Sequence, residues 1–140
     1  MTAERKYCAA AVLGDRLYVA GGVDAAGTIL RTVESFDPAA NAWRRERPMR
    51  CPRANFALVA ADKRGERLLF AVGGRSDLDE PSPHAESGTR PLRGVERSVE
   101  LFRPAAGGGR GEWSDRPADV RPMATPRCDH AAVALHKRCC

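Results

Sequence analysis

Short apolar runs that end in paired glycines dominate the hydrophobic pattern of this chain. Residues 16–22 (RLYVAGG) and 67–74 (RLLFAVGG) each place four or five mostly apolar residues directly before two glycines. Runs of this length are typical of buried strands and are too short for helices. A glycine pair fits a strand end where the backbone needs a positive φ or a neighbouring chain approaches closely. The pattern therefore predicts two copies of one strand in a repeated unit.

A hairpin precedes the first glycine pair. Residues 5–13 are rich in small side chains and predict a strand, and Gly14-Asp15 supplies a two-residue turn into the strand over 16–22. Residues 23–30 carry turn formers and little periodicity, so they predict a loop.

Two further strands complete the unit. Residues 31–37 alternate with a period of two and are ended by Pro38, which predicts a third strand followed by a turn. Residues 42–48 predict a shorter fourth strand, whose polar side chains indicate the edge of a sheet.

The unit then repeats with longer connections. The element P-M-x-x-P-R occurs at 48–53 and again at 122–127, each time before a run of small and apolar residues. Arg5 to Arg53 spans 48 residues and Arg53 to Arg127 spans 74, so the second unit is 26 residues longer. Insertions of 4, 14, 4 and 4 residues account for the whole difference. We expect all of them between strands, where a repeat tolerates changes in length.

Composition and charge exclude several classes of protein. With 43% hydrophobic and 29% charged residues, the 140-residue chain is composed like a globular domain, although its few aromatic residues predict a core of small side chains. The net charge of +5 comes from arginines that alternate with acids, which favours a solvated surface over a nucleic-acid site.

The cysteines and the N-terminus indicate an intracellular protein. Five cysteines without a C-x-x-C pair, together with a polar and charged N-terminus, predict a reducing, cytoplasmic compartment. No apolar run reaches membrane-spanning length, so we expect no membrane association.

Six elements occur twice in the same order, and together they resemble the kelch repeat. The resemblance covers roughly residues 5–135, and the second copy departs from the family at Arg103, where Asp is usual, and at Phe70 in place of Tyr. The residues that carry it are Gly21, Gly22, Tyr18, Val33, Glu34, Phe36, Asp37, Trp43, Pro48 and Met49 in the first copy, and Gly73, Gly74, Phe70, Val99, Glu100, Phe102, Trp113, Pro122 and Met123 in the second.

The resemblance implies an all-β fold of the kelch β-propeller type, in which each repeat is one four-stranded blade. Residues 5–52 form the first blade and 53–126 the second, with a long loop at 75–94. Residues 127–140 contain the first strand of a third repeat and a tail. Two blades cannot close a ring of four to eight, so we expect a fragment of a longer kelch protein that aggregates or oligomerises by itself.

The resemblance also suggests a partner-binding face. In kelch adaptors, arginines that lead into the first strand of each blade are among those that engage acidic peptide segments, and a guanidinium suits a carboxylate. The alternative is that these arginines hydrogen-bond loop carbonyls or an acid of the adjacent blade. The candidates are Arg5, Arg53 and Arg127, with Tyr7, Asn55 and Asp129 beside them.

Other recurring residues have structural interpretations. We expect the loop at 75–94 and the insert at 104–111 to be passive, and Glu34 and Glu100 to satisfy backbone donors near them. The aromatic and methionine side chains that recur in both units are expected to pack between blades: Tyr18, Phe70, Trp43, Trp113, Met49 and Met123.

Catalytic chemistry is not indicated. His84, His130 and His136 have no metal-ligand spacing, no phosphate-binding loop or nucleophile elbow is present, and the Tyr and His ligands of kelch-like copper oxidases cannot be assembled. We therefore expect no cofactor and no metal.

The expected function is a protein-interaction module. The resemblance suggests a substrate-recognition propeller of a cullin-RING ubiquitin ligase adaptor, whose BTB and BACK segments do not lie within these residues. A cytoskeletal or actin-associated kelch scaffold is the alternative.

Overall fold

The computed structural model describes residues 4–63, 65–76, 94, 96–105, 109–114, 121–127, 129 and 131–132. The described residues form eight strands and contain no helix. The predicted strand of the third repeat, residues 128–135, falls largely outside the described residues, as does most of the loop at 75–94.

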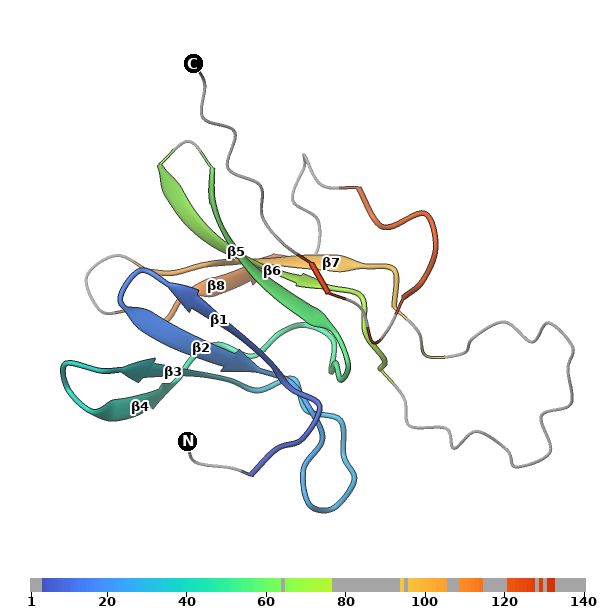
Figure 1. The fold of residues 1–140 in the computed structure, drawn as a ribbon, viewed down its shortest axis with the longest axis horizontal. Helices are drawn as coiled ribbons and strands as arrows, with labels where there is room; N and C mark the ends of the chain where they lie inside the picture. Colours follow the sequence, from blue (N-terminus) through green and yellow to red (C-terminus); the bar gives the residue numbers. More distant parts are fainter. Residues whose placement is uncertain are drawn as a thin grey trace, which may run out of the picture.

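The strands form two four-stranded antiparallel sheets, each in sequence order, as Figure 1 shows. The first consists of β1 (Ala9–Leu13), β2 (Arg16–Ala20), β3 (Val33–Asp37) and β4 (Ala42–Arg45). The second consists of β5 (Ala57–Lys63), β6 (Glu66–Val72), β7 (Val99–Arg103) and β8 (Glu112–Ser114). The predicted all-β fold of two four-stranded units is confirmed, and β4 lies at a sheet edge as its polar residues indicated.

The strands are shorter than predicted at their outer ends, for reasons of backbone conformation. β1 begins at Ala9 because Tyr7 has a φ of 57°, and Lys6 forms an isolated bridge with Val23. β2 ends at Ala20 because Gly21 has a φ of 61°, which a strand does not allow.

The insertion in the β5–β6 hairpin lengthens both strands, and the expectation that every insertion falls between strands was wrong here. β5 and β6 have seven residues each and pair as far as Lys63 with Glu66. Gly65 turns the chain with a φ of 82°, and its N–H donates to Asp62 Oδ1 at 3.0 Å. A glycine turn and an Asx contact allow the ladder to continue.

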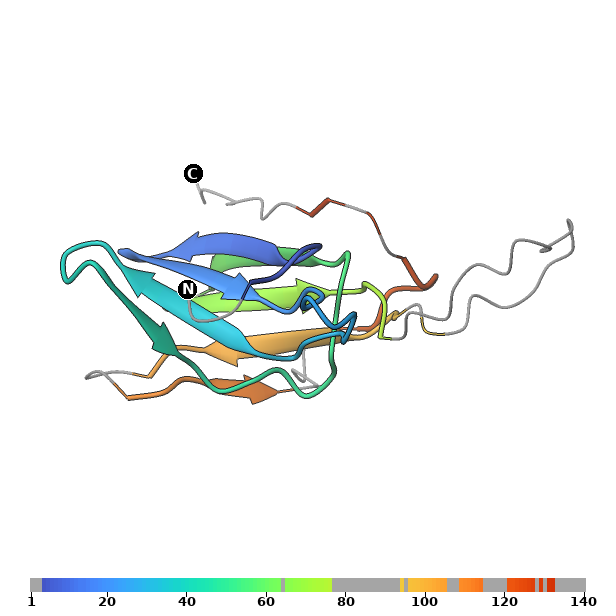
Figure 2. The ribbon, with the colours of Figure 1, turned by 90° about the horizontal axis from the view of Figure 1, so that it is seen from below.

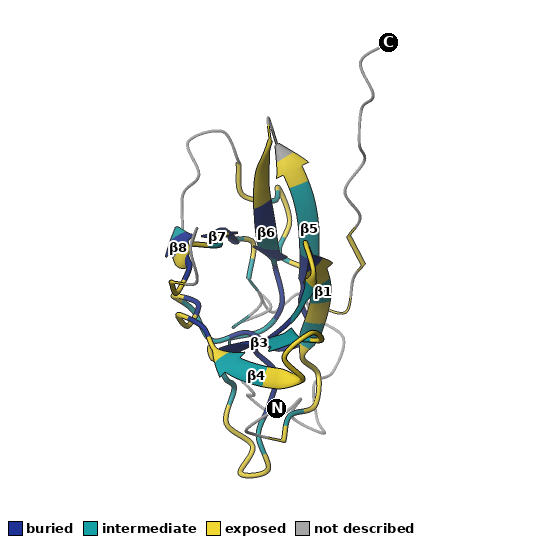
Figure 3. Ribbon diagram, turned by 90° about the vertical axis from the view of Figure 1, so that its left-hand side faces the viewer, coloured by how far each residue is buried: buried dark blue, intermediate teal, exposed yellow. Residues whose placement is uncertain are grey.

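The two sheets pack face to face around one core. Figure 2 shows β1 and β5 together on one side of the molecule, and β4 and β8 together on the other. Tyr18 of the first sheet meets Phe102 of the second edge to face, with ring centroids 5.7 Å apart. Buried stretches of β3, β6 and β7 are dark blue in Figure 3. The core between the sheets is one cluster of buried residues: Leu13, Tyr18, Ala20, Val33, Met49, Phe56, Leu58, Leu69, Ala71, Phe102 and Trp113.

The expected packing role of the recurring side chains is confirmed where they lie between the sheets. Tyr18, Met49 and Trp113 are buried there. Trp113 Nε1 also donates to Arg47 O of the segment after β4, at 3.0 Å. The equivalent Trp43 is half-buried and stacks on Phe36, with centroids 5.1 Å apart.

Candidate partner-binding face

Arg5 and Arg53 have their guanidinium groups turned inward. Arg53 is 0% exposed, and its Nη1 donates to Gly73 O at 2.6 Å while its Nη2 lies 2.9 Å from Glu100 Oε1. Arg5 makes the same pair of contacts, with Gly21 O at 3.0 Å and Glu34 Oε2 at 3.4 Å. Both arginines therefore bind a strand-end carbonyl and an acid.

Each arginine pairs with a glutamate of the sheet that directly follows it in the sequence. The alternative that the acid belongs to the adjacent blade is therefore wrong for Arg5 and Arg53. Arg53 precedes β5 and its partner Glu100 is on β7, in the same sheet. Partner binding by these arginines stays a prediction. For Arg53, binding would require the buried contacts to break.

Glu100 satisfies backbone donors, but they are distant in the sequence. Its carboxylate accepts from Arg50 N at 2.7 Å and from Cys51 N at 3.2 Å, as well as from Arg53. Residues 50–51 belong to the segment that joins the two sheets. The carboxylate therefore fixes this connection to the second sheet.

Arg127 differs from the other two arginines because its side chain is exposed. Its backbone keeps the repeated pattern: Gly74 N donates to Arg127 O at 2.8 Å, as Gly22 N donates to Arg53 O at 2.8 Å. The exposed guanidinium leaves Arg127 available at this surface.

Tyr7, Asn55 and Asp129 form a continuous row. All three have a positive φ, of 57°, 54° and 52°. Asn55 N donates to Tyr7 O at 3.0 Å and Asp129 N donates to Asn55 O at 2.9 Å. The Asn55 side-chain amide also donates to Asp129 Oδ1. The structure thus brings together three residues that are 48 and 74 positions apart.

The loop at 23–30 lies against the same surface. Lys6 N donates to Val23 O at 3.0 Å and Val23 N donates to Lys6 O at 2.8 Å. Asp24 Oδ1 accepts from Ala26 N and Thr28 N, which closes the loop on itself. A pocket of about 210 Å³ lies where the two segments meet and is lined by Glu4, Arg5, Lys6, Val23, Asp24 and Ala25.

The segments around the row carry exposed cations, together with the exposed acids Glu4 and Asp129. We use the name loop face for the surface formed by the row Tyr7, Asn55 and Asp129 and by the connecting segments at the same strand ends, which include Lys6, Arg31, Arg97 and Arg127. Tyr7 is 58% exposed. The exposed cations of the loop face form no ion pair with the described part of the chain. These cations are Lys6, Arg31, Arg97 and Arg127.

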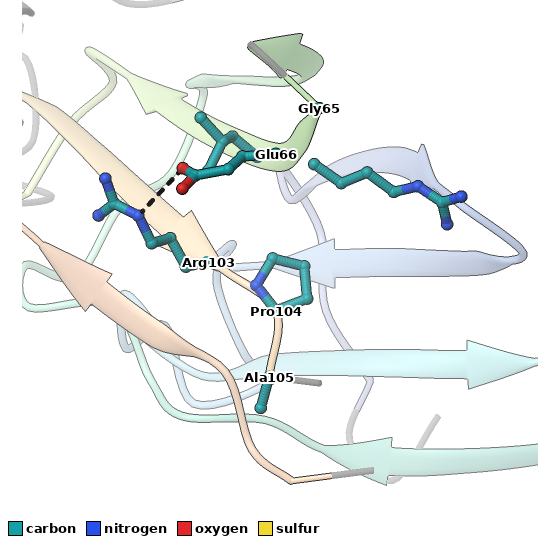
Figure 4. Close-up of a pocket in the computed structure, with 7 residues that line it drawn as sticks. Gly65, Glu66, Arg103, Pro104 and Ala105 are labelled. Atoms are coloured by element: carbon teal, nitrogen blue, oxygen red, sulfur yellow. Dashed lines mark ion pairs between the residues drawn. The ribbon is translucent and has the colours of Figure 1, made fainter. Parts of the chain in front are cut away.

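A second pocket, of about 380 Å³, lies at the β5–β6 turn. Figure 4 shows Glu66 and Arg103 on its wall, 3.7 Å apart in an ion pair whose side chains are mostly exposed. No buried polar group of the described residues points into it. The pocket is an open surface depression.

The buried side of the first sheet contains an ionised cluster. Glu46 Oε1 accepts from Ser35 Oγ at 2.7 Å and from Arg44 Nη2 at 2.7 Å. Burial, with a smaller contribution from the Glu46 charge, raises the pKa of Tyr18 above its ordinary value. Burial and the nearby Glu100 likewise raise the pKa of the Cys51 thiol.

A hydroxyl residue that binds the arginine also recurs in both repeats, and the sequence analysis did not predict it. Ser98 Oγ accepts from Arg53 Nη2 at 2.7 Å, and Thr32 Oγ1 accepts from Arg5 Nη1 at 3.2 Å. Both hydroxyls lie two residues before the glutamate, so R-T-V-E at 31–34 and R-S-V-E at 97–100 were a usable signal.

Within the described ranges, no three His, Cys, Asp or Glu side chains are grouped as metal ligands. No described helix could cross a membrane.

The comparisons with known proteins agree with this geometry. The Kelch motif family matches residues 4–50. Beta-scruin of Limulus polyphemus is 38% identical over 60 residues, which are 43% of this chain and 7% of Beta-scruin. Kelch-like protein 26 of Danio rerio is 35% identical over 69 residues, 49% of this chain and 11% of that protein.

The fold has a solved counterpart. The structure of YjhT superposes with a TM-score of 0.61 at 14% identity, covering 91% of this chain and 40% of YjhT. This likeness concerns the fold. The chain spans only a small part of the length of the relatives it matches. Two sheets of one topology, the repeated glycine, glutamate and tryptophan positions and the Kelch motif at residues 4–50 lead to one conclusion: the chain carries a Kelch motif and forms two blades of a kelch-type β-propeller.

Proposed function

We propose that the loop face binds an acidic segment of a protein partner. The observation that carries the proposal is the row Tyr7, Asn55 and Asp129, which offers an exposed aromatic ring and polar side chains on a hydrogen-bonded backbone. Rigid backbone lowers the entropy lost on binding, and exposed aromatic side chains are frequent anchors in interfaces.

The charge of the partner follows from the cations beside the row. Lys6 is next to Tyr7 and Arg127 is two residues before Asp129, and both are exposed. Arginine binds carboxylates in a bidentate manner, and such contacts weaken with salt. An acidic peptide complements this surface better than a basic or apolar one.

A labelled oligoglutamate peptide tests this proposal directly. We expect it to bind, with an affinity that falls as salt rises, while an oligoglutamine peptide of the same length does not bind. The double variant Lys6→Ala, Arg127→Ala should weaken binding at least about tenfold. Arg110→Ala, an exposed change far from the loop face, is the matched control. Equal binding of both peptides would contradict the proposal.

In the cell, this face would recognise substrates of a cullin-RING ubiquitin ligase. The resemblance of the repeat to kelch adaptors suggests this role, and Kelch-like protein 26 is one of the relatives. The test is co-precipitation of a cullin with the longest natural protein that contains these residues, and accumulation of ubiquitin on the captured partner. The cell compartment for this role is the cytoplasm.

A cytoskeletal scaffold is the second candidate. The relatives also include Beta-scruin, which is not named as a kelch-like protein, so the similarity does not select the ligase role alone. Co-sedimentation of the same protein with actin filaments, without cullin, would favour it.

A further inference from the structure

β4 is an edge strand with an open side. In the described part of the chain it pairs with β3 alone, and its residues are exposed or half-buried, yellow and teal in Figure 3. The unpaired edge of a strand presents backbone N–H and C=O groups to which another strand can add. The two sheets pack through their faces, so this packing leaves the edge of β4 uncovered.

The register shows which backbone groups of β4 are open. Glu46 N donates to Val33 O at 2.9 Å, so this pair of residues is hydrogen-bonded. Hydrogen-bonded and non-hydrogen-bonded pairs alternate along an antiparallel ladder. Arg44 therefore also bonds to β3, whereas the N–H and C=O groups of Trp43 and Arg45 point away from it.

The side chains of β4 and the residue after it separate the charges of this segment. Arg44 and Glu46 lie on the packed side of the sheet, where Arg44 Nε and Nη2 donate to Glu46 Oε1 at 3.0 and 2.7 Å. Arg44 Nη2 also donates to Gly109 O of the second sheet at 3.1 Å. The Glu46 side chain is 1% exposed. The one glutamate of residues 42–50 is thus turned inward and has an arginine as its partner.

The opposite side of β4 carries cations. Trp43 stacks on Phe36 there, with ring centroids 5.1 Å apart, and Arg45 follows on the same side because side chains alternate along a strand. Arg45 and Arg47 are both exposed. The sequence mixes arginine with glutamate in this segment, but the fold buries the acid and exposes these arginines. The edge therefore presents an aromatic ring and two cations beside open backbone groups.

Charge selects the kind of strand that can add to this edge. Two β4 edges from separate copies would bring arginines together, and like charges on neighbouring strands destabilise a sheet. An acidic strand reverses this interaction, because carboxylates pair favourably with arginines. A nucleic acid would match the charge, but it has no extended peptide backbone to continue the ladder at Trp43 and Arg45.

We infer that an extended acidic segment of a protein partner adds to β4 as an antiparallel strand. Backbone hydrogen bonds to Trp43 and Arg45 hold the segment, and its side chains give the specificity. Directly opposite residues share one side of a sheet, so the residues opposite Arg45 and Arg47 are acidic and the residue opposite Trp43 is apolar. The recognised pattern is acid-x-acid-x-apolar.

This inference is independent of the proposed function. It rests on the open edge of β4 and the charges beside it, whereas the proposed function rests on the row Tyr7, Asn55 and Asp129. The tests below use the 140-residue chain with Lys6→Ala and Arg127→Ala, which weakens the loop face. Their outcome therefore does not depend on binding at that face.

A labelled peptide of sequence T-E-T-E-T-V-T carries the expected pattern. In fluorescence anisotropy we expect it to bind, with an affinity that falls as salt rises. Adding Arg45→Glu and Arg47→Glu should weaken binding at least about tenfold and should create binding of T-K-T-K-T-V-T. Arg67→Glu with Arg121→Glu makes the same change of charge at exposed positions of the second unit. This matched control should bind T-E-T-E-T-V-T as before, and circular dichroism checks that every variant is folded.

N-methylation of the peptide tests the backbone hydrogen bonds. Residues opposite Trp43 and Arg45 turn their N–H groups toward β4, and the residues between them turn theirs away. N-methyl groups on the second glutamate and the valine should therefore abolish binding. N-methyl groups on the two threonines that precede these residues leave composition and charge the same and should preserve binding.

Two results would overturn the inference. A site made of arginines alone would bind both methylated peptides equally, and it would bind an oligothymidylate of the same charge as well as it binds the peptide. Absence of T-E-T-E-T-V-T binding would show that the arginines only protect the edge from self-pairing. An equal loss of binding in Arg67→Glu with Arg121→Glu would likewise place the site away from β4.

Discussion

Arg53 and Glu100 form an ion pair without exposed surface. The guanidinium donates to one carboxylate oxygen at 3.1 Å from Nε and 2.9 Å from Nη2, and the two side chains are 0% and 1% exposed. The same carboxylate holds the backbone of Arg50 and Cys51. The Glu100 carboxylate therefore fixes the connection between the two sheets to β7 at three residues.

Glu100→Gln should destabilise the fold strongly. Loss of the charge leaves Arg53 buried without its counter-ion, which costs about 3 to 5 kcal/mol. Urea unfolding at one fixed protein concentration measures the change. Glu66→Gln is the control, because its pair with Arg103 is exposed and should change stability by less than about 0.5 kcal/mol. Similar losses in both variants would contradict a special role for the buried pair.

Gly74→Ala should also be severe. Gly74 has a φ of 95°, and a Cβ there would lie 2.5 Å from Phe56 Cβ and 2.8 Å from Ala54 O. We expect a loss of more than about 2 kcal/mol from the steric conflict and the strained backbone. Gly27→Ala is matched in backbone, with a φ of 85° and nothing within 4 Å, and should cost only about 1 kcal/mol. Thermal unfolding of both variants separates the cost of the steric conflict at Gly74 from the cost of the strained backbone, which both variants share.

The stability of the chain should fall at alkaline pH through Tyr18. Burial and then the Glu46 charge raise the pKa of Tyr18 in the folded state, so the unfolded state loses this proton first. The free energy of folding that depends on protonated Tyr18 is fully present below the unfolded-state pKa of about 10 and is lost as pH rises through the higher folded-state pKa. Urea midpoints of wild type and Tyr18→Phe between about pH 8 and 11 measure it. The prediction fails if the two midpoints change in parallel.

Cys51 should react slowly with thiol reagents in the folded chain. Burial and the Glu100 charge raise the pKa of this thiol, which lowers the fraction of reactive thiolate at neutral pH. Cys8 is exposed and is the internal reference. Pulse alkylation followed by peptide mapping should label Cys8 before Cys51, and urea should abolish the difference. Faster labelling of Cys51 would refute this explanation.

The sequence by itself determined the elements and their order. Alternation of side chains, the glycine pairs and the repeated spacing are local or periodic properties, and strands follow from them directly. Trp43 and Trp113 could be aligned because the repeat places them at equivalent positions.

Tertiary structure alone decided what the recurring polar residues do. Arg53 could have faced a partner or the protein, and the choice depended on Gly73, Ser98 and Glu100, which are 20 to 47 residues away. The row of Tyr7, Asn55 and Asp129 depends on positive φ values and on backbone hydrogen bonds between repeats. Neither is encoded in residue spacing, because burial and long-range pairing are set only when the two sheets pack together.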